Sequence, residues 1–153
     1  MQLKFRIILN VKDDVLRDVV TDSNITLMEF NKIIFTIFGF QTQEISTFFQ
    51  TNDNWEQLEE VKIFKLDDKD EIMDSVPISN FLFEKNDKMI FIYDFLCYWT
   101  FFVELYDLEE NKMIDKKYEV LNSVGMVPKN PPLDIFTVEN NPDRTDIDEN
   151  FDQ

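Results

Sequence analysis

Apolar and polar residues alternate along several short stretches of the chain. In the stretch 3–9, "LKFRIIL", every second residue is apolar, and the residues at positions 4 and 6 are charged. This period of two is typical of a strand with one buried face. Runs of strand-forming residues predict further strands at 16–21, 45–51, 60–66 and 116–121, although the stretch 11–20 also fits a turn of helix.

A period of three to four residues marks the stretch "NITLMEFNKIIFTIFGF" as a helix. Thr26 and Glu29 have the spacing of a capping box, in which each side chain accepts a hydrogen bond from the backbone N–H of the other residue. Apolar residues then form one stripe, and Gly39 can adopt the left-handed conformation that ends a helix. The sequence predicts a long core helix that begins at Thr26.

A shorter helix is predicted in the segment 75–87, "SVPISNFLFEKND". Asp74 or Ser75 stands where its N-cap would lie, and Pro77 falls in the first turn, where the missing N–H has no intrahelical partner to lose. Three apolar side chains would face the core, which are Ile78, Phe81 and Leu82.

The stretch 91–107, "FIYDFLCYWTFFVELYD", is strongly aromatic. Strand-forming runs at 88–95 and 99–108 flank Leu96, Cys97 and Tyr98, which predicts a hairpin. Both faces of these runs are apolar, as in strands that lie centrally between two packed layers. We interpret the aromatic side chains as core because they bury large areas. A stacking platform for bases or a peptide groove is the alternative.

Together these elements predict the α+β fold class, with a mainly antiparallel β-sheet packed against one long and one short helix. A chain of 153 residues has about the size of one domain. We place this domain at 1–136. The remaining residues, 137–153, are rich in acids and follow several prolines, which predicts a disordered acidic C-terminal tail.

The net charge of the chain favours some classes of binding partner over others. Its 31 Asp and Glu residues against 15 Lys and Arg residues give a formal net charge of −16. Binding to a phosphate backbone depends on basic side chains, so direct nucleic-acid binding is disfavoured. An acidic surface suits a basic protein partner, or the imitation of a nucleic acid in front of a DNA-binding protein.

Two further features bear on the location of the protein. The lone cysteine, Cys97, cannot form an intramolecular disulfide, and the first residues, "MQLKFRIILNVKDD", carry charges where a signal peptide needs an unbroken apolar run. The sequence also lacks an uncharged apolar stretch of about 20 residues that could span a bilayer. It therefore predicts a cytoplasmic protein without membrane association.

The residues that most enzymes use are scarce. The chain has no histidine and only two glycines, which removes histidine-based nucleophiles and metal sites, as well as phosphate-binding glycine loops. The acidic runs at 67–71 and 146–152 lack the glycine of a calcium loop, and the sequence near Cys97 offers only acids, which disfavour a thiolate. We predict no catalytic, cofactor-binding or metal-binding residue, no cofactor, and no enzymatic activity.

The order of the motifs resembles that of the plasmid pRiA4b ORF-3-like family. An opening strand, the "TLMEFNKII" helix, a "STFF" strand before an Asp-Asn-Trp turn, and a "YDF" hairpin carry the likeness, which covers residues 1–135. The chain is closer to an acidic-tailed branch from Bacteroidetes-type bacteria than to the main family. The resemblance implies an α+β fold with a mainly antiparallel sheet, an association with mobile elements, and a resolvase-like name without an established activity.

Two motifs of that family are incomplete in this chain. The family hairpin reads Tyr-Asp-Phe-Gly-Asp-x-Trp followed by histidine. Tyr93, Asp94, Phe95 and Trp99 match it, but Leu and Cys replace Gly-Asp and no histidine follows. Of a Pro-Pro-Glu-Asp motif, two prolines and one acid remain at 131, 132 and 134. Recombinase chemistry needs several arginines around a nucleophile, whereas the arginines here are scattered at Arg6, Arg17 and Arg144.

These observations favour a non-enzymatic protein-interaction domain with an unidentified, basic protein partner. The turn "NDNW" and the aromatic hairpin supply the candidate interaction residues, which are Asp53, Trp55, Asp94, Tyr98 and Trp99. One alternative is an acidic nucleic-acid mimic or modulator of a DNA-processing partner. The other is a carboxylate-dependent metal hydrolase, which requires three or more acids in one pocket. The oligomeric state is left open by the sequence.

Overall fold

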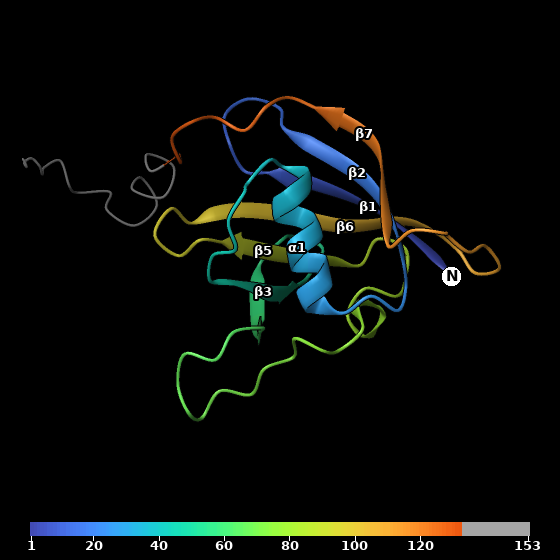
Figure 1. The fold of residues 1–153 in the computed structure, drawn as a ribbon, viewed down its shortest axis with the longest axis horizontal. Helices are drawn as coiled ribbons and strands as arrows, with labels where there is room; N and C mark the ends of the chain where they lie inside the picture. Colours follow the sequence, from blue (N-terminus) through green and yellow to red (C-terminus); the bar gives the residue numbers. More distant parts are fainter. Residues whose placement is uncertain (133–153) are drawn as a thin grey trace, which may run out of the picture.

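Residues 1–132 are described by the computed structural model, and seven strands in this part of the chain form one sheet (Figure 1). All neighbouring strands are antiparallel. The predicted tail at 137–153 and the predicted domain end at 136 lie outside the described residues. In their order across the sheet, the strands are β4 (Gln57–Lys62), β3 (Ser46–Thr51), β5 (Lys88–Tyr93), β6 (Trp99–Glu109), β1 (Gln2–Leu9), β2 (Leu16–Asp22) and β7 (Tyr118–Val124).

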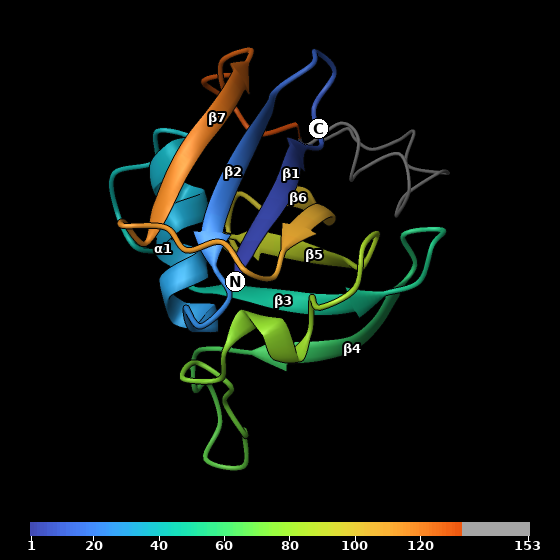
Figure 2. The same ribbon diagram turned by 90° about the vertical axis from the view of Figure 1, so that its right-hand side faces the viewer.

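The predicted aromatic hairpin lies in the middle of this sheet. β5 and β6 pair with each other, and β6 also pairs with β1, so β6 is the central strand. The sheet is strongly twisted, and Figure 2 shows β1, β2 and β7 at a steep angle to β3 and β4. β5 and β6 each pair with a strand on both sides, so neither has a free backbone edge.

One α-helix in the described residues, α1 (Leu27–Ile37), packs against one face of the sheet, which we call the inner face (Figure 1). The predicted capping box is confirmed, since the Thr26 Oγ1 atom accepts from the Glu29 N–H at 3.1 Å and the Glu29 Oε1 atom accepts from the Thr26 N–H at 3.0 Å. Gly39 follows the helix with φ at 91°. Within residues 1–132, none of the helices has the length and apolarity of a membrane span.

The hydrophobic core fills the space between α1 and the inner face. Phe30 of α1 lies 4.9 Å from Phe5, measured between ring centroids, and Phe38 lies 4.8 Å from Phe101. Alternate residues of the aromatic hairpin are buried here, as predicted, but Phe95 is 40% exposed and lies outside the core. The buried hairpin residues on this face are Met89, Phe91, Tyr93, Trp99, Phe101, Val103 and Leu105.

The predicted fold class, α+β with one long and one short helix, is wrong, because residues 1–132 form mostly antiparallel β-sheet with a single short α-helix. The second helix shrinks to a 3₁₀ turn, η1 (Ile78–Asn80), and neither Asp74 nor Ser75 caps it. The Ile78 N–H donates to the Ile25 carbonyl, and the Val76 carbonyl accepts from the Leu27 N–H. Pro77 is extended and forms an antiparallel β-bridge with Thr26, so the segment 76–78 pairs with the start of α1 and does not begin a longer helix.

The strand predicted at 60–66 is β4, but it begins earlier, at Gln57, and ends at Lys62. The carboxylate of Asp70 causes this end: its Oδ2 atom accepts from the Leu66 and Asp67 N–H groups, both at 3.0 Å, and bends the chain into a turn. Its Oδ1 atom accepts from the Lys62 Nζ atom at 2.7 Å. The segment after β4 is therefore a loop held against the end of the strand.

Candidate protein-binding surface

β4 is an edge strand, paired with β3 on one side only. The Lys62 carbonyl accepts from the Met73 N–H at 2.7 Å, so the backbone polar groups of Lys62 point away from β3. These directions alternate along an antiparallel strand, so the N–H and C=O of Glu60 point the same way. In residues 1–132, Met73 is the only backbone donor that reaches this free edge. The edge is open at Glu60.

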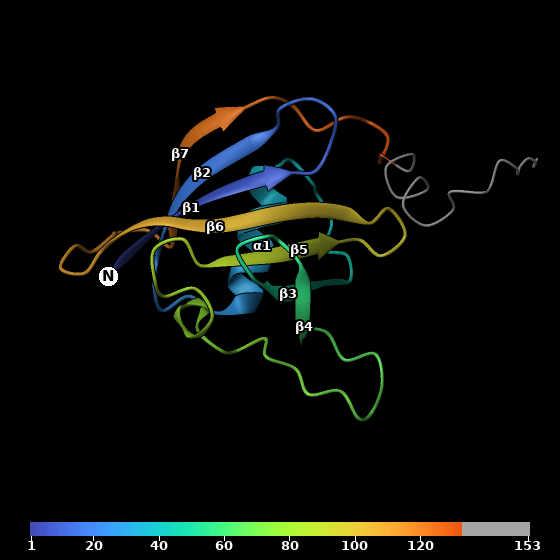
Figure 3. The same ribbon diagram turned by 180° about the vertical axis from the view of Figure 1, so that it is seen from behind.

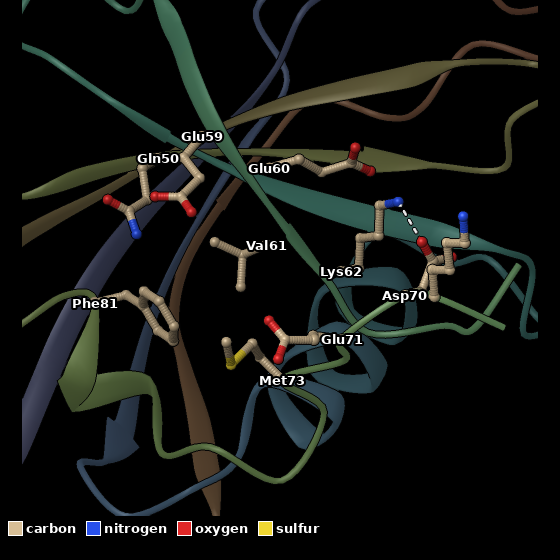
Figure 4. A pocket seen from close by; sticks show the side chains of 10 residues that line it. Gln50, Glu59, Glu60, Val61, Lys62, Asp70, Glu71, Met73 and Phe81 are labelled. Carbon is tan, nitrogen blue, oxygen red and sulfur yellow. Dashed lines mark hydrogen bonds and ion pairs between the residues drawn. The ribbon is translucent and has the colours of Figure 1, made fainter. Parts of the chain in front are cut away.

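A hollow of about 290 Å³ lies beside β4, between the strand and the returning loop (Figure 4). We call it the edge hollow. Val61, Met73 and Phe81 give it an apolar floor, and the carboxylates of Glu59 and Glu71 stand at its rim. Figure 4 shows Val61 between these two acids. A side chain with an apolar stem and a cationic end would meet complementary groups here.

The electrostatics of the edge hollow are acidic. Lys62 lines it, but its ammonium group is paired with Asp70, which holds the pKa of that carboxyl below its usual value with help from the backbone N–H groups of Leu66 and Asp67. The same hydrogen bond raises the pKa of Lys62. Within residues 1–132, Glu59 and Glu71 form no ion pair. Besides Lys62, Lys69 also lines the edge hollow, and its positive charge offsets part of the negative charge of Glu59 and Glu71.

A second hollow, of about 200 Å³, lies on the face of the sheet opposite α1, which we call the outer face. We call it the outer hollow. Seen from behind in Figure 3, α1 lies beyond the strands and this face is toward the reader. Glu60 contributes a carboxylate whose Oε2 atom accepts from the Thr47 hydroxyl at 2.8 Å. The other lining residues are largely aromatic or aliphatic, which are Phe49, Ile92, Phe95 and Tyr98.

The structure places Tyr98, one of the predicted interaction residues, at this outer hollow. Asp94, also predicted, shapes the turn that carries it: the Asp94 carbonyl accepts from the Cys97 and Tyr98 N–H groups at 3.0 and 2.6 Å. Asp94 and Tyr98 have positive φ angles of 65° and 58°. Such backbone is unfavourable for residues with a side chain and persists where the surroundings impose it. The turn therefore holds the wall of the hollow in place.

Asp53 and Trp55 lie elsewhere on the outer face, in the turn between β3 and β4. The Trp55 ring packs edge-on against Phe102, with 5.1 Å between centroids, and the Lys88 Nζ atom lies 5.7 Å from the Trp55 centroid. Lys88 also pairs with Asp53 at 3.5 Å and with Glu104 at 3.7 Å. These contacts fix the turn against the sheet. A role for Asp53 and Trp55 in partner binding stays a prediction.

Trp99, the last predicted interaction residue, lies in the core. Its side chain is 5% exposed, and its ring centroid is 5.4 Å from that of Phe40. Its inward direction follows from its place as the first residue of β6, since it alternates with Thr100 on the outer face. The predicted residues thus form three separate groups, and Tyr98 is the one that lines the outer hollow.

The sequence prediction missed the acids of the edge hollow. Glu59 and Glu60 are consecutive in β4, so their side chains reach the two different hollows, while Glu71 comes from the returning loop. A signal existed: adjacent acids in a strand-forming stretch place one carboxylate on each face. Glu71 lies in a later segment of the chain, and no local pattern in the sequence predicts that it lines the same hollow as Glu59.

The described residues also bear on the hydrolase alternative. Residues 1–132 contain no group of three or more His, Cys, Asp or Glu side chains that could hold a metal ion. The four acids near the edge hollow are spread along its rim and, in the case of Asp70, paired with Lys62. The convergence that this alternative requires is absent from this part of the chain.

A family model described as plasmid pRiA4b ORF-3-like protein matches residues 1–139. The chain belongs to this family. The resemblance seen in the sequence motifs is thereby confirmed. Of the hairpin motif, Tyr93 is buried and donates its hydroxyl to the Thr42 carbonyl, while Asp94 and Phe95 lie in the turn at the outer hollow.

The fold of this family member is similar to a solved structure, the "Crystal Structure of Protein of Unknown Function MM3350 from Methanosarcina mazei Go1". The TM-score is 0.62 and the sequence identity 14%, over 80% of this chain and 69% of that one. At this identity the likeness shows the fold alone. None of the curated proteins matches the chain.

Proposed function

We propose that this family member is a non-enzymatic protein-interaction domain that binds a basic segment of a partner protein beside β4. The edge hollow carries the proposal, because its apolar floor lies between Glu59 and Glu71, two carboxylates without an ion pair in residues 1–132. A lysine or arginine side chain has an apolar stem and a charged end that match this arrangement. The net charge of −16 adds long-range attraction for a basic partner.

The same charge would suit an acidic nucleic-acid mimic, but the two functions differ in what they need. A mimic presents many carboxylates over a wide surface, and the loss of any two would weaken binding about equally. Binding of a basic segment at the edge hollow instead depends on Glu59 and Glu71 in particular. A cytoplasmic setting, which the lone Cys97 favours, is part of the proposal.

Titration calorimetry with a capped decapeptide of alternating lysine and threonine tests the proposal. The double variant Glu59→Gln/Glu71→Gln should bind at least about tenfold more weakly, since two charge-assisted contacts are lost. The matched control is Glu110→Gln/Glu119→Gln, which removes the same charge from exposed positions in the turn before β7 and on β7 itself. This control should bind almost as tightly as the unchanged protein.

Two results would overturn the proposal. If both double variants weaken binding alike, attraction by overall charge is sufficient and the mimic is the better explanation. If the unchanged protein fails to bind the lysine peptide at low salt, where electrostatic attraction is strongest, the edge hollow is not a site for basic segments.

A further inference from the structure

Glu60 borders both hollows, and this position suggests how a partner is held. The Glu60 side chain reaches the outer hollow, where the Thr47 hydroxyl donates to one of its carboxylate oxygens. Glu60 also lines the edge hollow on the other side of β4. A single strand thus separates two hollows that both contain a carboxylate. A ligand that follows the strand would meet both.

The backbone of Glu60 offers the contacts that such a ligand needs. Its N–H and C=O point to the free edge, as the Met73 hydrogen bond to the Lys62 carbonyl indicates. An extended segment can pair with these groups and add a strand to the sheet. Because all existing pairs in the sheet are antiparallel, an antiparallel addition continues the same pattern.

We infer that β4 binds its partner by strand addition, and that the partner segment contains two adjacent basic residues, an arginine followed by a lysine or arginine. This inference rests on the proposed function and specifies its ligand. The first residue pairs with Glu60, so its side chain lies on the outer face. The next residue lies opposite Glu59, and its side chain points to the edge hollow, since successive side chains in a strand alternate between faces.

The chemistry of the outer hollow selects arginine for the first position. A planar guanidinium group can stack on the aromatic side chains of Phe49, Phe95 and Tyr98. It can also donate paired hydrogen bonds to the Glu60 carboxylate, a geometry that lysine cannot match. The edge hollow, whose floor contains a single aromatic ring, that of Phe81, and whose two acids are separate, accepts either cation.

Two capped peptides of equal composition test the inference by calorimetry. In Thr-Arg-Lys-Thr-Val-Thr-Val-Thr the basic residues are adjacent and point to opposite sides, and a single residue precedes the arginine because Met73 occupies the edge at Lys62. In Thr-Arg-Thr-Lys-Val-Thr-Val-Thr they point to the same side and cannot fill both hollows. The adjacent peptide should bind about tenfold more tightly, which corresponds to one charged hydrogen bond.

Backbone methylation gives a second readout that charge alone would not change. A methyl group on the arginine amide, which faces β4, should weaken the adjacent peptide about tenfold because it removes one edge hydrogen bond and blocks the approach. A methyl group on the lysine amide, which faces solvent, should leave binding unchanged. Hydrogen exchange of the Glu60 amide should slow when the adjacent peptide binds.

Failure of this inference can be told apart from failure of the proposed function. If adjacent and spaced peptides bind alike and the two methylated peptides do not differ, strand addition is overturned. In that case the proposed function stands provided that Glu59→Gln/Glu71→Gln still weakens binding and its matched control does not. If neither peptide binds at low salt, both the inference and the proposed function fail.

Discussion

Phe101 and Phe102 are neighbours in β6, but they lie on opposite faces of the sheet in very different surroundings. Phe101 is 0% exposed and packs under α1 against Phe38. Phe102 is half-buried on the outer face, where the ring of Trp55 covers it from the β3–β4 turn. The helix closes the inner face along its length, whereas turns close the outer face only in places. The same strand therefore has one face that is fully packed in the core and one face that is only partly covered.

Ion pairs cover parts of the outer face that aromatic rings do not cover. Arg6 of β1 makes two hydrogen bonds of 2.8 Å to the carboxylate of Asp18 in β2, and this contact raises the pKa of Arg6. Lys88 of β5 lies between Asp53 and Glu104. Arg6 and Asp53 are 47% and 95% exposed at the side chain, so solvent screening keeps the contribution of the Arg6–Asp18 and Lys88–Asp53 pairs to stability small. The outer face can therefore tolerate changes that the inner face cannot.

The largest effect is expected from Phe101→Ala on the inner face. Loss of this fully buried ring should lower the free energy of unfolding by about 3 to 5 kcal/mol, because a cavity remains in a tightly packed core. Urea denaturation followed by circular dichroism measures the change. A loss no greater than that of Phe102→Ala would contradict the assignment of stability to the inner face.

Phe102→Ala tests the outer face of the same strand. A half-buried ring with one edge-on aromatic partner should contribute about 1 to 2 kcal/mol. The emission of Trp55 should also shift to longer wavelength as its ring becomes exposed. Measuring this in a Trp99→Phe background leaves Trp55 as the only tryptophan, since the chain has two. Unchanged Trp55 emission would mean that the turn does not rest on Phe102.

Thr26→Ala tests the helix that closes the inner face. The Oγ1 atom that accepts from the Glu29 N–H is lost, which should lower the free energy of unfolding by about 1 kcal/mol. Thr26→Ser keeps this oxygen and should retain most of the stability. If Thr26→Ala and Thr26→Ser have the same urea midpoint, the cap does not stabilise α1.

The smallest effect is expected from the charge of Glu29. A hydrogen bond from Lys117, together with the Thr26 backbone N–H, lowers the pKa of this carboxyl in the folded state. The charge therefore stabilises the fold above the ordinary glutamate value of about 4.3, and this stabilisation is lost as the pH falls through the folded-state value. The Glu29 side chain is 32% exposed, so solvent screening keeps the effect small.

Glu29→Gln isolates this charge, because the glutamine oxygen can still accept from Thr26. The variant should be less stable than the unchanged protein at pH 7 and should approach it at pH 3. Urea midpoints at the two pH values measure the difference. A difference that is the same at both pH values would show that Lys117 does not act through the charge of Glu29.

Local signals allowed α1 to be predicted from the sequence at both ends. Thr26 and Glu29 are three residues apart, and each side chain accepts a hydrogen bond from the backbone of the other. Gly39 follows the helix with a positive φ angle. Both of these signals are local and can be read from the sequence, whereas the Leu27 and Met28 N–H groups donate to the distant Val76 and Asp74 carbonyls. The alternation of β1 and β6 was predictable for the same reason, since each strand shows its buried face in its own residues.

Contacts between distant segments explain what the sequence did not predict. The segment 75–87 has apolar spacing suited to a helix, but its backbone pairs with Ile25 and Leu27, some 50 positions earlier in the chain. The edge hollow likewise joins Glu59 of β4 to Glu71 and Phe81 of later segments. The order of strands in the sheet brings these residues together, and no single stretch of the sequence predicts that order.

The pairing of β1 with β6 has a consequence for the synthesis of the protein. Leu3 lies opposite Leu108, so β1 obtains its second neighbour, β6, only after most of the described chain has been made. Until then β1 and β2 form at best a lone hairpin with an unpaired apolar edge, a species prone to aggregation. The interval before β6 has been made is therefore the period in which the nascent chain is most prone to aggregation.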